Sequence, residues 1–187
     1  MKVKVGRITN LSDARYCAGM GVDMLGFPVG ARALAPHTYR QLIDWVSGPE
    51  LVLEVDEQES DLEQIKANYP GHLVQIQASR HALLADRSVQ FIVSLSAHEW
   101  PQFRDVLRHQ PHILYVQVKA TADQVPLVQE INAAFPVLWE VADGSAIKQY
   151  EASGVAGLAL TGGAEEKPGL RDYSTLADVL EQLEVDA

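Results

Sequence analysis

The sequence alternates, eight times along its length, between a short apolar run and a stretch in which apolar residues recur with helical spacing. Short runs rich in Val, Ile and Leu are typical of buried strands, and a 3.6-residue spacing is typical of amphipathic helices. This alternation predicts a parallel sheet covered by helices, because parallel neighbours must be joined by a crossover. The expected strands are Val3–Ile8, Val22–Phe27, Leu51–Val55, Leu73–Gln77, Val89–Leu95, Ile113–Val118, Val137–Val141 and Val155–Leu160.

Eight strand–helix units predict a closed (β/α)₈ barrel, the TIM-barrel fold, in preference to an open sheet. The chain has 187 residues, so the barrel would be compact beside the usual length of about 250. An open, doubly wound sheet would carry a glycine fingerprint after its first strand, and Gly6–Leu11 does not contain one. We therefore expect residues 1–187 to form a single barrel domain.

The charge and residue content exclude several classes of partner. A net charge of −10 argues against nucleic acids and anionic membranes, which attract clustered Lys and Arg. No apolar run approaches the ~20 residues of a membrane span, and no signal-peptide core is visible. Cys17 is the only cysteine, so no internal disulfide can form, which fits a cytoplasmic protein. Four histidines share no ligand spacing, and the other two, His109 and His112, lie near the start of a strand, at the end of a barrel that serves stability, so we expect no metal and no organic cofactor. The mixed outer helix faces leave monomer and homodimer both open.

Strand alternation places many polar residues inside the expected barrel. Because successive side chains point to opposite faces, the apolar residues of each strand should face the helices and their neighbours the lumen. Barrel interiors are usually filled by branched apolar side chains, so this lumen is unusually polar. The inward set is Lys4, Gly6, Glu54, Asp56, Gln75, Gln77, Ser94, Ser96, Tyr115, Gln117, Lys119 and Glu140.

Charges placed in a barrel must be paired or exposed to a ligand, because an unpaired buried charge costs several kcal/mol. Lys4 should therefore pair with Glu54 or with Glu140. The same alternation turns Arg7 toward the helices, with its charged end at the surface. Two interpretations of the polar lumen stay open: a sealed structural core, or a ligand-binding mouth at the carboxyl ends of the strands.

A glycine-bearing stretch, Leu160–Tyr173, follows the last expected strand and precedes a helix beginning near Ser174. A strand, a glycine loop and a helix in this order present backbone N–H groups to an anion, and barrels often hold phosphate after their last strands. We expect Thr161, Gly162 and Gly163 to bind a phosphate group. The alternative is an ordinary tight turn with a helix cap.

Both ends of the chain resemble the phosphoribosylanthranilate isomerase family. Met1–Ala14 reads MKVKVGRITNLSDA and resembles the family's M-K-V-K-I-C-G-I-T-N-x-x-D-A, and Gly21–Phe27 resembles its G-A-D-A-L-G-F. Arg32–Pro36 is similar to the loop S-P-R-x-V-S-P, Val74–Gln77 to V-Q-L-H, and the Leu160–Tyr173 stretch to S-S-G-V-E-x-x-P-G-x-K-D. The resemblance implies the same barrel, and a phosphorylated small molecule as the ligand.

The resemblance also implies an Amadori rearrangement in tryptophan biosynthesis, which needs an acid and a base. The family's cysteine base corresponds to Gly6 here, its aspartate acid to Gln117, and its histidine on the fourth strand to Gln77. The seventh-strand phosphate turn, A-G-G-L, is replaced by Trp139–Gly144. Losing one general acid or base costs roughly 10²–10⁴ in rate, so the loss of both would leave little turnover.

We therefore expect a family-like barrel that binds a phosphorylated molecule, with its standard isomerase activity lost. Substrate-binding candidates are Lys4, Arg32, Gln77 and Lys119. One alternative is a genuine isomerase with relocated groups, for which the candidates are Glu54, Asp56, Gln117 and Glu140. Cys17 is not such a candidate, because it lies on the apolar face of the first helix. Another alternative is a non-catalytic interaction protein.

Overall fold

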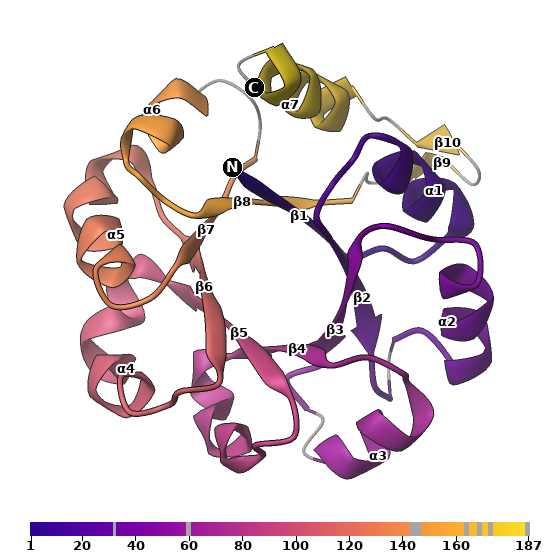
Figure 1. Ribbon diagram of the computed structural model, residues 1–187, viewed down its shortest axis with the longest axis horizontal. Coiled ribbons are helices and arrows are strands. Elements are labelled where there is room, and N and C mark those ends of the chain that lie inside the picture. The colour runs from indigo at the N-terminus through magenta and orange to yellow at the C-terminus, as the bar shows by residue number, and fades with distance from the viewer. Residues whose placement is uncertain are drawn as a thin grey trace.

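The chain folds into a closed barrel of eight parallel strands, which confirms the predicted fold class. A computed structural model of the protein describes residues 1–31, 33–58, 61–142, 147–162, 165–167, 170–171 and 174–185. Each strand pairs with its neighbours in chain order, and β1 closes the ring against β8 (Figure 1). The strands are β1 (Lys2–Gly6), β2 (Met24–Val29), β3 (Glu50–Val55), β4 (Leu73–Gln77), β5 (Gln90–Ser96), β6 (Ile113–Lys119), β7 (Val137–Glu140) and β8 (Gly157–Thr161).

Helical segments follow every strand and surround the barrel (Figure 1). The α-helices are α1 (Leu11–Gly19), α2 (Pro36–Ile43), α3 (Leu62–Asn68), α4 (Trp100–Leu107), α5 (Val125–Asn132), α6 (Ile147–Ala152) and α7 (Ser174–Val185). Short 3₁₀ segments η2 (Ala97–Glu99) and η3 (Ala122–Gln124) lead into α4 and α5, and the 3₁₀ segment η1 (Ala78–Ala85) takes the place of a helix after β4.

Local sequence signals explain where several helices begin. Asn10 caps α1, since its side-chain oxygen accepts a hydrogen bond from the N–H of Asp13 at 2.9 Å. Proline occupies one of the first helical positions of α2, α4 and α5, where its missing N–H costs nothing. Pro36 begins α2 as the sequence predicts. Helix boundaries therefore follow ordinary capping chemistry.

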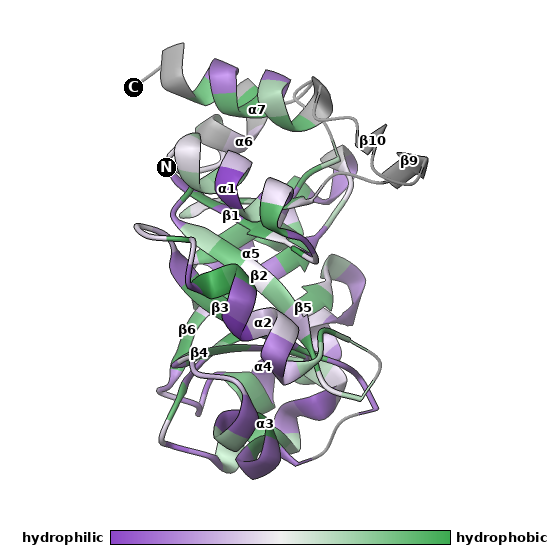
Figure 2. Ribbon diagram, turned by 90° about the vertical axis from the view of Figure 1, so that its right-hand side faces the viewer, coloured by the Kyte–Doolittle hydropathy of each residue, from purple (hydrophilic) through white to green (hydrophobic). Residues whose placement is uncertain are grey.

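The main hydrophobic core lies between the barrel and its helices. Val5, Val74, Val93 and Val118 are buried on the helix-facing side of their strands, as alternation predicts. Figure 2 shows mainly hydrophobic strands in the middle of the side view and hydrophilic residues on the helices facing the viewer. This core packs the helices against the outer face of the barrel.

A second, smaller apolar cluster lies inside the barrel, below the polar residues. We call it the lumen plug, and it consists of Met24, Val52, Leu73, Ile92, Leu138 and Ala159. Two residues after each member, nearer the carboxyl end of the same strand, comes the next lumen-facing residue. The plug therefore fills the amino-terminal half of the lumen. Leu114 and the predicted lumen residue Tyr115 pack against it. The polarity expected of the lumen is therefore confined to its carboxyl-terminal half.

The segment between β8 and α7 differs from the expected simple loop. The structure has two short antiparallel strands there, β9 (Glu165–Lys167) and β10 (Leu170–Arg171). The helix that follows begins at Ser174, as predicted.

Cys17 is fully buried in the main core on α1, and burial raises the pKa of its thiol to about 12. At pH 8 the thiolate fraction is then about 10⁻⁴, and the thiolate is the reactive form. We expect the native protein to resist modification by Ellman's reagent and the unfolded protein to release one equivalent of thionitrobenzoate. Stoichiometric modification of the native protein within seconds would contradict this burial.

Candidate functional site

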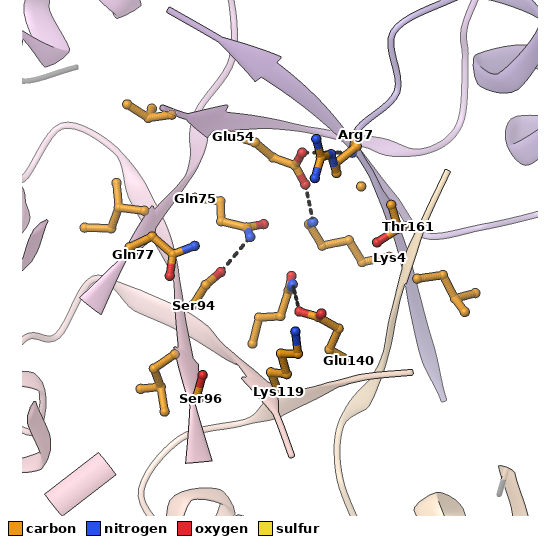
Figure 3. A pocket seen from close by; sticks show the side chains of 16 residues that line it. Lys4, Arg7, Glu54, Gln75, Gln77, Ser94, Ser96, Lys119, Glu140 and Thr161 are labelled. Carbon is orange, nitrogen blue, oxygen red and sulfur yellow. Dashed lines mark hydrogen bonds and ion pairs between the residues drawn. The ribbon is translucent and has the colours of Figure 1, made fainter. Parts of the chain in front are cut away.

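A pocket of about 400 Å³ opens at the carboxyl-terminal mouth of the barrel, above the lumen plug. Five of its lining residues are charged and six are amides or hydroxyls, whereas none of the described lining residues is aromatic. The charged residues are Lys4, Arg7, Glu54, Lys119 and Glu140, and the polar ones are Gln75, Gln77, Ser94, Ser96, Gln117 and Thr161 (Figure 3). Among the described lining residues, three cations and two carboxylates give a net positive charge, although the whole chain carries −10.

The floor of the pocket holds an ion pair between Lys4 on β1 and Glu54 on β3. The Lys4 Nζ lies 2.6 Å from Glu54 Oε1, and the two side chains are 1% and 14% exposed. The other carboxylate oxygen, Oε2, accepts the backbone N–H of Arg7 at 2.8 Å. Of the two partners that the sequence allows for Lys4, the structure selects Glu54, and this pair neutralises the most deeply buried charge of the site.

Two glycines make room for the Glu54 carboxylate. A Cβ added at Gly6 or at Gly26 would lie within 3.0 Å of Glu54 Oε1, which is closer than real Cβ contacts come. Glu54 thus occupies the space into which a side chain at residue 6 would project. The position that resembles the family's cysteine is therefore filled by a carboxylate from another strand.

The opposite wall is built from strands β4 to β7. Gln117 donates from Nε2 to Glu140 Oε2 at 3.1 Å, and Gln75 donates from Nε2 to Ser94 Oγ at 2.6 Å. The Oε1 atoms of Gln75 and Gln117 are buried and have no hydrogen-bond partner among the described residues. Buried acceptors of this kind are normally satisfied, so both are available to donors of a ligand or of water.

Nearer the opening, Lys119, Gln77 and Ser96 end their strands at the pocket rim. Lys119 lies beside Glu140 in the register of β6 and β7, yet it makes no ion pair with any residue that the structure describes. Glu140 likewise contacts the neutral Gln117 amide and no described cation. Among the residues that the structure describes, Lys119 and Glu140 therefore each face the pocket without an ion-pair partner.

Arg7 departs from its expected orientation. Alternation turns it toward the helices, but its φ of +58° places it in the left-handed region and breaks the alternation directly after β1. The side chain is exposed and lines the pocket on the same side as Glu54 and Thr161 (Figure 3). Strand alternation therefore predicts the wrong orientation for the Arg7 side chain. The one signal in the sequence is that Arg7 stands where the family that the chain resembles has glycine.

The expected phosphate loop is only partly described. Thr161 ends β8 and lines the pocket, but the N–H of Gly162 donates to the carbonyl oxygen of Gly6 at 2.8 Å. That N–H is therefore engaged within the protein. Gly163 lies outside the described residues, and so does Arg32, the candidate on the loop after β2.

Asp56, unlike the other three candidate catalytic residues, is not among the described residues that line the pocket. It follows the last residue of β3, and its Oδ1 accepts the N–H of Gln58 at 2.8 Å, which closes a local turn. The alternation that places Glu54 inside ends with the strand, so it does not apply to Asp56.

No group of three or more His, Cys, Asp or Glu suited to a metal ion occurs among the residues that the structure describes. Within the same part of the chain, no helix has the length and apolar character needed to cross a membrane.

The chain has the fold of phosphoribosylanthranilate isomerases of known structure. The enzyme from Thermus thermophilus superposes with a TM-score of 0.77 at 18% identity, covering 100% of both chains. The enzyme from Pyrococcus furiosus gives 0.75 at 12% identity, with 99% of each chain covered. A phosphoribosylanthranilate isomerase in complex with reduced 1-(o-carboxyphenylamino)-1-deoxyribulose 5-phosphate gives 0.74 at 16% identity, again over 99% of both. At such low identity the likeness concerns the fold. No protein-family model and no curated protein matches the sequence.

Proposed function

We propose that this barrel binds a phosphorylated small molecule in the pocket at its carboxyl-terminal mouth, without the isomerase activity that its resemblance implies. The observation that carries the proposal is the lining of the pocket: it is net positive within an acidic chain and rich in amides and hydroxyls. Cations at the mouth favour an anion, and amides and hydroxyls can bind the hydroxyl groups of a sugar. A structural relative that holds a ribulose 5-phosphate derivative supports the same ligand class.

The loss of isomerase activity is supported by the two positions that resemble the family's acid and base. Gly6 has no side chain, and the Gln117 amide, which donates to Glu140, cannot supply a proton as an acid does. The Glu54 carboxylate lies over Gly6, but Lys4 and the Arg7 N–H each engage one of its oxygens. A base held by two donors is poorly suited to take a proton from a substrate.

Binding is tested by isothermal titration calorimetry with ribose 5-phosphate, ribose and inorganic phosphate. We expect saturable binding of ribose 5-phosphate, weaker binding of phosphate, and no measurable binding of ribose. We also expect the affinity to fall as salt is raised, since exposed charges are screened. Equal heats for ribose 5-phosphate and ribose, or none for either, would refute phosphate recognition.

A second candidate, a genuine isomerase with relocated groups, is favoured by one observation: Glu140 faces the pocket without a described cation partner. Growth of a strain lacking phosphoribosylanthranilate isomerase, when it expresses this protein well, separates the two. We expect no growth. If the strain does grow, a Glu140→Gln variant that still binds ribose 5-phosphate should lose roughly 10²–10⁴ in turnover.

A further inference from the structure

Two hydrogen bonds, made by the N–H groups of Arg7 and of the next residue, hold the backbone at Arg7 in a left-handed conformation. A non-glycine residue with positive φ is uncommon, and for a long side chain it costs free energy relative to glycine. The N–H of Arg7 is bound by Glu54 Oε2, and the next N–H, that of Ile8, donates to the carbonyl oxygen of Gly26 at 2.8 Å. Because these contacts fix the backbone, the residue type at position 7 is free to be glycine. Folding does not require an arginine at this position, so its presence points to another reason.

The charges around Arg7 supply such a reason. Lys4, the nearest other cation on β1, is neutralised by Glu54. The Arg7 guanidinium makes no ion pair with any described residue, and its side chain is exposed at the pocket. On the β1 and β8 side of the mouth, Arg7 is therefore the available cation among the residues that the structure describes.

On the same side of the mouth, the backbone N–H of Gly162 is not free to bind the phosphate. A loop that binds phosphate does so with free N–H groups, but Gly162 donates to the carbonyl oxygen of Gly6. A Cβ at Gly162 would come within 3.2 Å of that same oxygen, so the close approach is part of the turn. Thr161 pairs with Gly6 across β8 and β1, and its exposed side chain lines the pocket directly beside this turn.

We propose that Arg7 is the anion-binding residue of the pocket: its guanidinium holds the phosphate of the ligand, with the Thr161 hydroxyl as a neighbouring donor. This rests on the function proposed above and names the group that recognises the phosphate. A guanidinium offers a fork of donors that matches two phosphate oxygens, which a single backbone N–H does not. The left-handed backbone turns this fork from the helix side to the pocket side.

Arg7→Gly removes the guanidinium and leaves the backbone in a conformation that glycine adopts freely. We expect this variant to melt at the same temperature as the wild type or higher, and to bind ribose 5-phosphate about tenfold to a hundredfold more weakly. Arg7→Lys keeps the charge and should retain part of the affinity. Arg87→Ala removes an exposed arginine before β5, at the opposite end of the barrel, and should leave binding unchanged.

The outcomes separate this proposal from the previous one. Wild-type affinity in a folded Arg7→Gly variant would overturn the role of Arg7 alone and leave phosphate binding in place. A melting temperature far below that of the wild type would show that Arg7 serves the fold, and would also overturn it. If the wild type binds neither ribose 5-phosphate nor inorganic phosphate, both proposals fall.

Discussion

Replacing Glu54 with glutamine is expected to lower the free energy of unfolding by about 3 kcal/mol, because it leaves the Lys4 ammonium buried beside a neutral group. This value is at the lower end of the range for a broken buried pair, since the carboxylate faces an open pocket that water reaches. Urea denaturation followed by circular dichroism measures the change. A loss below 1 kcal/mol would mean that the pair is solvated like a surface one.

Two further variants make this measurement specific. Adding Lys4→Met to Glu54→Gln should recover most of the lost stability, since the double variant leaves no unpaired charge. Glu63→Gln removes a carboxylate that pairs with Lys66 on the surface and is 82% exposed, so its effect should stay within about 0.5 kcal/mol. A double variant no more stable than Glu54→Gln would show that the Lys4 charge is not the cause.

A Gly6→Cys substitution is expected to destabilise the barrel by about 2 kcal/mol, because the new Cβ would collide with the Glu54 carboxylate. In a Glu54→Ala background the same substitution should cost less, since the nearest obstacle is gone and only the flexible end of Lys4, with its Nζ 3.0 Å from the added Cβ, remains. Gly19→Ala is the matched control: nothing lies within 4 Å of its added Cβ, and alanine there should be neutral or slightly stabilising. Equal costs of Gly6→Cys in both backgrounds would disprove the steric coupling.

This coupling has a functional counterpart. Installing the family's two groups, with Gly6→Cys and Gln117→Asp, should not restore growth of a strain lacking the isomerase while Glu54 remains. The carboxylate and the new thiol compete for one space, so one of them is displaced. Growth of the strain with this pair alone would show that the pocket accommodates both.

Strand alternation predicted most of the site from the sequence, because it depends only on which residues are buried. It places Lys4, Glu54, Gln117 and Glu140 in the lumen, and the structure brings all four to the pocket. It also restricts the partner of Lys4 to two carboxylates. The choice between them depends on which carboxylate reaches over Gly6 and Gly26, and that depends on geometry rather than pattern.

Strand alternation fails to predict the orientation of residues that lie just beyond the end of a strand. Asp56 and Arg7 each lie one residue beyond a strand, and there the period of two no longer decides which way a side chain points. The turn at Asp56 and the left-handed φ of Arg7 are properties of single residues in their surroundings. Likewise, a glycine at position 162 is compatible with either a free or an engaged N–H, and only the register of β1 and β8 shows that it is engaged.

The lumen plug makes the pocket a well with a single entrance. Met24, Leu73, Ile92 and Leu138 are each 2% exposed or less, so the barrel axis offers no passage to the opposite end. A molecule must leave by the opening through which it entered, and a second molecule cannot pass the first. A compound bound nearer the opening should therefore slow both the entry and the escape of one that lies beneath it, even where the two share no contact in the pocket.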